Sequence, residues 1–220
     1  MDGTITDSGI GCPEIGFFEL ILRDLLAERN GSPLDEALKE VITLESLVPG
    51  QDPFLALNRH DVGVTAENLW CRIMEERDKY IFPYTDAIGM IEHLQQDGYK
   101  LYTASNISRS RILAVLGAIG ISSSLQGSPC FIEAYGRDLT GCMKDTPEFY
   151  RHLLKRENLN GAETVMIGDS VKDDYLTAKA AGINRSIIVN RQQEAAVIKE
   201  SGVCYISSLA SVPAIIKGWN

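Results

Sequence analysis

Hydrophobic residues recur every three or four positions through the first third of the chain, which is the spacing of an amphipathic helix. Between residues 9 and 80 this pattern is broken mainly by Gly, Pro and Asn, the residues that end helices. The first helical stretch places its apolar residues at Ile15, Phe18, Leu22, Leu25 and Leu26. We therefore predict that residues 9–80 form a group of helices without a strand.

From about residue 83 the pattern changes to short apolar runs that alternate with helical segments. Such runs are typical of strands buried in a parallel sheet. Strands are predicted at 100–104, 130–132, 163–167, 186–189 and 203–206. Helices are predicted at 85–97, 108–118, from Pro147, at 171–181, near 192–200 and at the end of the chain. This alternation predicts a doubly wound α/β core made of residues 1–8 and 81–220, with 9–80 inserted as a helical domain.

Composition and charge narrow the class of protein. An apolar share of 45% and a charged share of 23% are those of a soluble globular protein. A net charge of −9 without a basic block argues against a nucleic-acid partner, although a small phosphorylated molecule needs only a local positive site. No apolar run approaches the length of about 18 residues that a membrane span requires, and no segment resembles a signal peptide. We expect a cytoplasmic protein, and its oligomeric state stays open.

The cysteines give no sign of a disulfide framework or a zinc site. Their number, five, is odd, and no two of them form a Cys-x-x-Cys pair. We expect reduced and mostly buried thiols.

Carboxylates gather directly after the predicted strand at 163–167. Gly168-Asp169 follows the strand, and Asp173 and Asp174 come at the start of the next helix. One interpretation is local, because acidic residues cap and stabilise helix N-termini. The other is that Asp169 and Asp174 hold a hard divalent cation such as Mg²⁺.

Two further segments carry possible anion-binding groups. Lys144 precedes a helix that Thr146-Pro147 starts, and a cation is electrostatically disfavoured there. Ser105 and Asn106 follow the strand at 100–104, where they could cap a helix, bind an anion, or do both. Taken alone, each segment is also consistent with ordinary surface residues.

At the start of the chain, Asp2-Gly3-Thr4 is by itself a turn signal. Taken with the three later segments, it resembles the first motif of haloacid dehalogenase-superfamily phosphatases, Asp-x-Asp-Gly-Thr. The other segments resemble the family's remaining motifs in the family's order: a hydroxyl after the second strand, Lys-x-x-Pro, and Gly-Asp-x-x-x-x-Asp. The resemblance covers the whole chain and implies a Rossmannoid core with a helical cap of the first type.

The resemblance also implies roles for individual residues. Asp2 would protonate the leaving oxygen and later activate water, and Lys144 would neutralise the nucleophile and the transferring phosphoryl group. Binding of the phosphoryl oxygens falls to Thr4, Ser105, Asn106 and Lys144. Mg²⁺ would be held by Asp2, Asp169 and Asp174.

The family's nucleophilic aspartate is expected one position ahead of Met1, at the end of an apolar strand. The resemblance places that strand in mid-sheet, between the strands that end at Ser105 and Asp169. Its five or so apolar side chains would contribute on the order of 10 kcal/mol to stability. We therefore expect apolar residues and an aspartate immediately upstream, and we expect the 220-residue chain alone to lack phosphatase turnover.

The implied reaction is Mg²⁺-dependent hydrolysis of a small phosphorylated metabolite through an aspartyl-phosphate intermediate. An aspartate at position 2 favours a phosphatase or a phosphomutase, because dehalogenases and phosphonate-cleaving relatives lack it. A β-phosphoglucomutase-like phosphomutase and a non-catalytic binding protein of the same fold remain alternatives.

Overall fold

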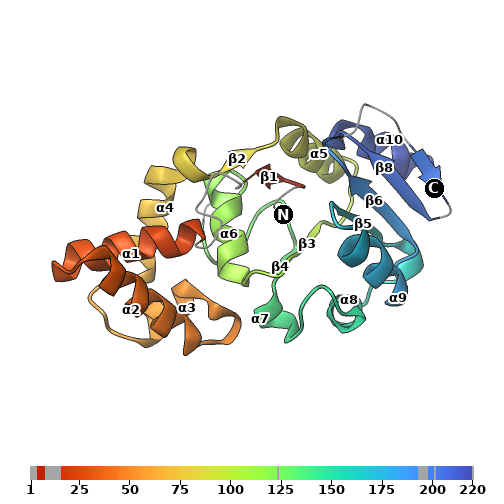
Figure 1. The fold of residues 1–220 in the computed structure, drawn as a ribbon. Coiled ribbons are helices and arrows are strands. Elements are labelled where there is room, and N and C mark those ends of the chain that lie inside the picture. Colours follow the sequence, from red (N-terminus) through yellow and green to blue (C-terminus); the bar gives the residue numbers. More distant parts are fainter. Residues whose placement is uncertain (1–3, 8–15, 123, 193–197, 201, 220) are drawn as a thin grey trace.

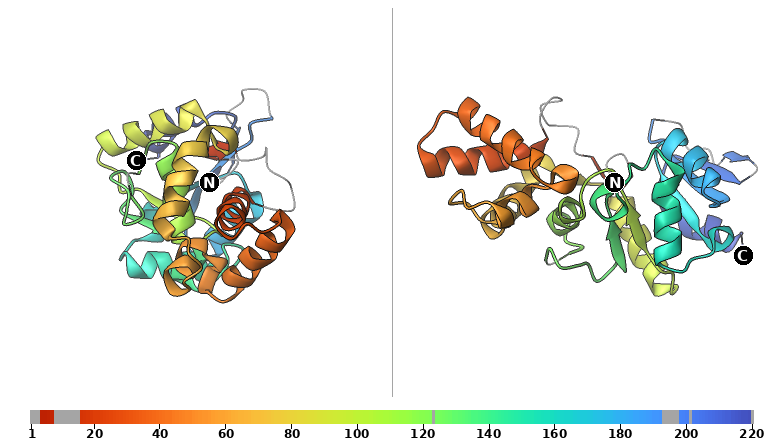
Figure 2. Two further views of the ribbon diagram at one scale, coloured as in Figure 1. Left: turned by 90° about the vertical axis from the view of Figure 1, so that its left-hand side faces the viewer. Right: turned by 90° about the horizontal axis from the view of Figure 1, so that it is seen from below.

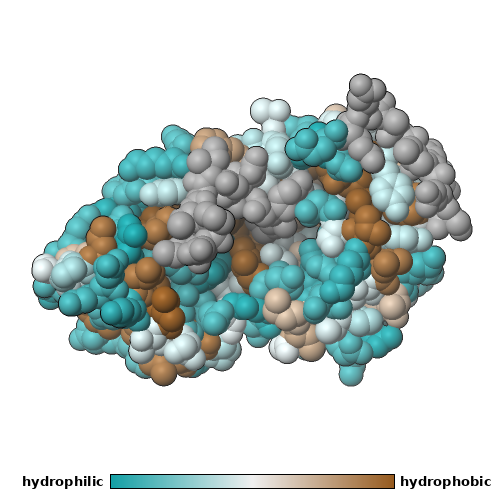
Figure 3. Space-filling view, in the orientation of Figure 1, coloured by the Kyte–Doolittle hydropathy of each residue, from teal (hydrophilic) through white to brown (hydrophobic). Residues whose placement is uncertain are grey.

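A computed structural model of the chain describes residues 4–7, 16–122, 124–192, 198–200 and 202–219 (Figure 1). The molecule is elongated, with a lobe of helices at one end and an α/β lobe at the other, as the view from below also shows (Figure 2, right). The visible face is mostly hydrophilic, and its hydrophobic patches are scattered over both lobes (Figure 3). None of the helices in these described ranges is long and apolar enough to cross a bilayer.

The helical lobe forms because local signals start and stop each helix. Gly31 ends the first helix with a φ of 64°, a left-handed conformation that glycine adopts without strain. Asp52 starts the third by accepting hydrogen bonds from the N–H groups of Phe54 (2.9 Å) and Leu55 (3.2 Å). The helices of the lobe are α1 (Phe17–Asn30), α2 (Leu34–Ser46), the 3₁₀ turn η1 (Pro49–Gln51), α3 (Pro53–Arg59) and α4 (Ala66–Tyr80). Between 16 and 80 the structure thus has the helices that the sequence predicted.

Where the chain passes between the lobes, two short strands pair antiparallel. These are β1 (Thr6–Asp7) and β2 (Phe82–Pro83).

The α/β lobe contains parallel strands in two separate ladders. In the first, β3 (Tyr102–Ala104) pairs with β4 (Glu133–Tyr135). The second ladder has the order β5-β6-β8-β7, with β7 antiparallel at its edge. Its strands are β5 (Val165–Gly168), β6 (Arg185–Val189), β7 (Ile198–Glu200) and β8 (Val203–Ile206). The predicted doubly wound α/β class is confirmed.

Helices pack on the strands through two hydrophobic clusters. The larger cluster includes residues of α5, α6 and α10, and the smaller one joins α8 and α9 to β4. In α6, Gly117 lies against Trp70 of α4, which connects the lobes: a Cβ at Gly117 would come within 2.5 Å of that ring. The helices are α5 (Thr85–Gln96), α6 (Arg109–Ala118), α7 (Arg137–Thr140), α8 (Pro147–Arg156), α9 (Ala178–Ala180) and α10 (Val212–Lys217), with 3₁₀ turns at Gly161–Glu163 and Leu209–Ser211.

Two sequence predictions about elements were wrong. The strand expected at 130–132 begins later, at Glu133, where pairing with β3 starts, and Ile132 is 56% exposed. The helix expected near 192–200 is contradicted at 198–200, which pair as β7 with β8; 193–197 lie outside the described residues. The helix predicted at 171–181 is confirmed: it consists of the π-helix η3 (Val171–Thr177) followed by α9.

The cysteine prediction was only partly right. Four cysteines lie in the described ranges, and none of these four is in a disulfide; among them Cys204 is buried, Cys130 and Cys142 are half-buried, and Cys71 is exposed. The fifth, Cys12, lies outside the described residues.

Candidate active site

The loop after β5 is organised by Asp174, a fully buried carboxylate. Its Oδ2 accepts hydrogen bonds from the backbone N–H groups of Asp169 (3.1 Å) and Ser170 (3.0 Å), which folds the loop back onto the start of η3. Gly168 is required at this turn, since a Cβ there would lie 2.1 Å from the Asp174 carboxylate. Ser170 then caps η3 by accepting from the N–H of Asp173 (3.1 Å).

Lys144 is the positive partner of this carboxylate. Its Nζ lies 2.8 Å from Asp174 Oδ1, and the side chains of the two residues are 10% and 0% exposed. The hydroxyl of Tyr150 lies 3.3 Å from the same Oδ1 and donates to the carbonyl oxygen of Asp173 (2.9 Å). Burial, and then the charge of Asp174, raise the pKa of Tyr150, so its hydroxyl stays a donor. Removing either side chain would leave the charge of the other buried and unpaired. Each member of the Lys144–Asp174 pair therefore stabilises the buried charge of its partner.

The end of β3 is tied to the same lysine. Asn106 accepts a hydrogen bond at its Oδ1 from the backbone N–H of Lys144 (2.6 Å). Ser105, just before it, is buried and continues the ladder by donating its N–H to the carbonyl oxygen of Tyr135 (3.0 Å). The carboxyl ends of β3 and β5 therefore meet at Lys144, as the α/β class predicts for a ligand site.

Thr4, near the start of the chain, lies beside the loop that follows β5. Its hydroxyl donates to Asp169 Oδ1 (3.1 Å), and its carbonyl oxygen accepts from Arg191 Nη2 (2.8 Å). Arg191 also makes two 3.1 Å hydrogen bonds to Asp86 and stacks 3.5 Å from the ring centre of Tyr84. Burial alone would raise the pKa of Asp86, but hydrogen bonds from Arg191 and neighbouring donors outweigh it and lower the pKa.

The structure thus brings together most of the residues that the sequence singled out: Thr4, Ser105, Asn106, Lys144, Asp169 and Asp174. Asp2 lies outside the described residues. Sequence reasoning missed Tyr150, Asp86 and Arg191, whose contacts join distant parts of the chain. Two local signals in the sequence could have pointed to these site residues. Asp86 lies in the first turn of a predicted helix, and Arg191 follows the end of a predicted strand.

For a Mg²⁺ ion the described residues supply part of a site. Asp169 is exposed and offers carboxylate oxygen, the ligand type that Mg²⁺ prefers, and a buried oxygen of Asp173 has no hydrogen-bond partner. Both oxygens of Asp174 already face protein donors, so direct coordination by Asp174 stays a prediction. Within the described ranges no three acidic, His or Cys side chains are grouped to hold a metal, and the predicted ligand Asp2 lies outside these ranges.

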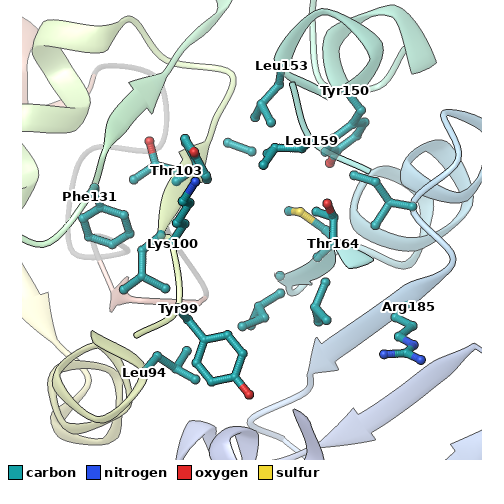
Figure 4. A pocket seen from close by; sticks show the side chains of 18 of the residues that line it. Leu94, Tyr99, Lys100, Thr103, Phe131, Tyr150, Leu153, Leu159, Thr164 and Arg185 are labelled. Carbon is teal, nitrogen blue, oxygen red and sulfur yellow. The ribbon is translucent and has the colours of Figure 1, made fainter. Parts of the chain in front are cut away.

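Two hollows adjoin the site. A cavity of about 510 Å³ reaches from Thr4, Lys144 and Gly168 along the space between β3 and β5 (Figure 4). A second hollow, of about 350 Å³, is lined by the η1 turn of the helical lobe and by Met143, next to Lys144. Arg137 of the α/β lobe contacts the helical lobe at this hollow, where it donates a hydrogen bond to the carbonyl oxygen of Gly50 (2.6 Å).

The family of the chain follows from a comparison with protein-family models. The model of the haloacid dehalogenase-like hydrolases matches residues 1–182, and the chain belongs to this family. A comparison with curated proteins finds no match.

Solved structures with the same fold include both phosphatases and dehalogenases. A HAD phosphatase from Thermococcus onnurineus is 23% identical, with 99% of this chain and 95% of that chain covered and a TM-score of 0.60. A 2-haloacid dehalogenase from Pseudomonas syringae is 21% identical (100% and 96% covered, TM-score 0.62). The HAD-hydrolase YfnB from Bacillus subtilis, solved bound to magnesium, is 19% identical (98% and 95% covered, TM-score 0.55). At these identities the likeness concerns the fold alone.

Proposed function

We propose that the protein hydrolyses the phosphate monoester of a small metabolite with the help of Mg²⁺, through an aspartyl-phosphate intermediate. The observation that carries this proposal is the buried Lys144–Asp174 pair at the meeting point of β3 and β5, with Ser105, Asn106 and Thr4 around it. The nucleophile in this proposal is an aspartate joined directly ahead of Met1.

Charge balance explains why these residues suit phosphoryl transfer. A phosphoryl group beside several carboxylates needs positive charge, and catalysis of its transfer consists mainly of positioning and electrostatic stabilisation. Lys144 supplies one fixed cation, since Asp174 and Asn106 hold its side chain and its backbone. Bound Mg²⁺ would supply further positive charge at the phosphoryl oxygens and is assigned to Asp169 and Asp2. YfnB, which is similar in fold, was solved bound to magnesium, and this supports Mg²⁺ as the metal of the proposal.

The remaining roles follow from position. The hydroxyls of Thr4 and Ser105 and the amide of Asn106 are assigned to the phosphoryl oxygens. Asp2 is assigned to protonate the leaving oxygen and then to take a proton from the attacking water, so that the aspartyl phosphate is hydrolysed. The helical lobe would exclude bulk water and contact the organic part of the substrate.

A phosphate-release screen tests the proposal. The protein is extended by an apolar strand that ends in aspartate ahead of Met1, and it is assayed with Mg²⁺ on a panel of sugar and small-acid phosphates. We expect turnover by the extended chain and none by the extended chain carrying Asp169→Asn. Detection of an isomerised sugar phosphate instead of free phosphate would assign the chain to phosphomutases. Failure on every ester, with the fold intact, would contradict the proposal.

A further inference from the structure

Arg191, in the turn that follows β6, contacts two parts of the chain that are far from it in sequence. Its Nη1 and Nη2 each donate to one oxygen of Asp86, in the first turn of α5, at 3.1 Å. Nη2 also donates to the carbonyl oxygen of Thr4 (2.8 Å). The guanidinium lies 3.5 Å from the ring centre of Tyr84. Two hydrogen-bonded edges and one stacked face fix both the position and the tilt of this planar group.

The geometry of Arg191 favours the contact with Thr4 over full pairing of its own donors. Asp86 has other donors, because its Oδ2 also accepts from the hydroxyl of Ser208 (2.7 Å) and the N–H of Leu209 (2.9 Å). On the arginine, Nε is buried and has no hydrogen-bond partner among the described residues. A buried donor without a partner is unfavourable, and an arginine that served the carboxylate alone could turn to use Nε. The observed orientation instead places Nη2 on the Thr4 carbonyl.

Thr4 connects this arginine to the loop after β5. The residue is 5% exposed, and its hydroxyl donates to Asp169 Oδ1 (3.1 Å). The carbonyl oxygen of the next residue, Ile5, accepts from the N–H of Tyr84 (3.0 Å), whose ring stacks on Arg191. Two consecutive carbonyl groups are therefore held from the same side of the chain. Because Asp169 is exposed, the orientation of its carboxylate depends on this anchored hydroxyl.

We propose that Arg191 is a positioning residue of the candidate active site: it fixes the main chain at Thr4, so that the Thr4 hydroxyl orients Asp169 toward a bound Mg²⁺. The functional part of this inference rests on the proposed hydrolysis, in which Asp169 holds that ion. Since Asp86 pairs the charge of the guanidinium, Arg191 acts by geometry. Side chains that orient a metal ligand affect the affinity for the metal by about 10- to 100-fold.

Arg191→Lys separates geometry from charge. Lysine keeps the positive charge and can pair with Asp86, but a single ammonium group lacks the planar fork that spans Asp86 and the Thr4 carbonyl. Ser208→Ala is the matched control, because it removes another hydrogen bond to Asp86 and leaves Arg191 and Thr4 in contact. Arg191→Gln is made in parallel, so that a folding failure of one variant does not remove the test.

Titration of the full chain with Mg²⁺ in a calorimeter gives the first readout. We expect Arg191→Lys and Arg191→Gln to weaken Mg²⁺ binding about tenfold, and Ser208→Ala to match the wild type. Thr4→Val should weaken binding about as much, and adding Arg191→Lys to it should weaken binding no further, because both changes act through one hydroxyl. Wild-type affinity in the Arg191 variants, or losses that multiply in the double variant, would overturn the inference.

The side chain of Thr4 gives a second readout that needs no metal. Three-bond couplings of its methyl group, measured by NMR, report its χ1 rotamer. We expect one rotamer in the wild type and in Ser208→Ala, and averaging over several rotamers in both Arg191 variants. An unchanged rotamer in these variants would overturn the inference. Absence of Mg²⁺ binding by the wild type, with the Thr4 rotamer responding as expected, would count against the proposed function alone.

Discussion

Raising the pH from 4.5 to 8 should lower the free energy of unfolding, because Glu45 is a buried acid with a raised pKa. Glu45 of α2 and Glu19 of α1 each lie 2.7 Å from the same Nη2 of Arg111 in α6. Burial raises the pKa of Glu45; Arg111 opposes this, and the neighbouring charges of Glu19 and Asp52 add to it. The pKa rises from 4.5 to about 7.

The sign and the size of the effect follow from linkage. Since the folded state holds the Glu45 proton more tightly than the unfolded state, the stabilisation is fully present below pH 4.5 and is lost as the pH rises through 7. A pKa raised by this amount corresponds to about 3 kcal/mol in the free energy of unfolding. Glu45→Gln removes this titration, so the variant should lack that part of the pH dependence.

Urea unfolding at pH 4.5, 5.5, 6.5 and 7.5 checks the prediction, with the wild-type chain compared with Glu45→Gln. Glu36→Gln, an exposed position on the same helix, is the matched control and should follow the wild type. Identical pH dependence in the wild type and Glu45→Gln would refute the reasoning, because it would mean that folding leaves the pKa of Glu45 unchanged.

Three further substitutions test the site. Lys144→Met should lower the free energy of unfolding by about 3–5 kcal/mol in urea titrations, because the buried Asp174 loses its cation; adding Asp174→Asn should recover part of this loss. Gly168→Ala should lower stability by about 1–3 kcal/mol in thermal unfolding, because its Cβ would overlap the Asp174 carboxylate. Gly89→Ala, with open space around its Cβ, is the control and should stabilise the helix slightly. Asp169→Asn should weaken Mg²⁺ binding about tenfold or more in calorimetry, and unchanged affinity would exclude Asp169 as a ligand.

Elements with strong local signals could be predicted from the sequence. Thr146-Pro147 predicts the start of α8, since proline fixes φ at a value suited to the first helical turn. The run at 203–206 predicts β8 correctly, because it is apolar and flanked by turn residues. β7 could not be predicted in this way, because its identity depends on antiparallel pairing with β8 rather than on its own residues.

The same distinction applies to the site. The position of Lys144 before a helix and of Asp169 after a strand are local facts, and the family resemblance gave them roles. Arg191 contacts Thr4 across 187 positions in the chain, and Tyr150 contacts Asp174 across 24. Such contacts arise from packing, so no local pattern indicates them, and these supporting residues appear only in the folded structure.

Asp169 and Asp174 have different surroundings in the folded protein, although the sequence predicted the same role for both. The carboxylate oxygens of Asp174 contact Lys144, Tyr150 and two backbone N–H groups of the loop. Asp174 therefore fixes the position of the lysine and the shape of the loop. Asp169 remains exposed, with one oxygen held by Thr4. A cation that binds here should therefore depend on Asp169 directly and on Asp174 through the loop geometry. Asp174→Asn should accordingly weaken Mg²⁺ binding less than Asp169→Asn, while it destabilises the protein more.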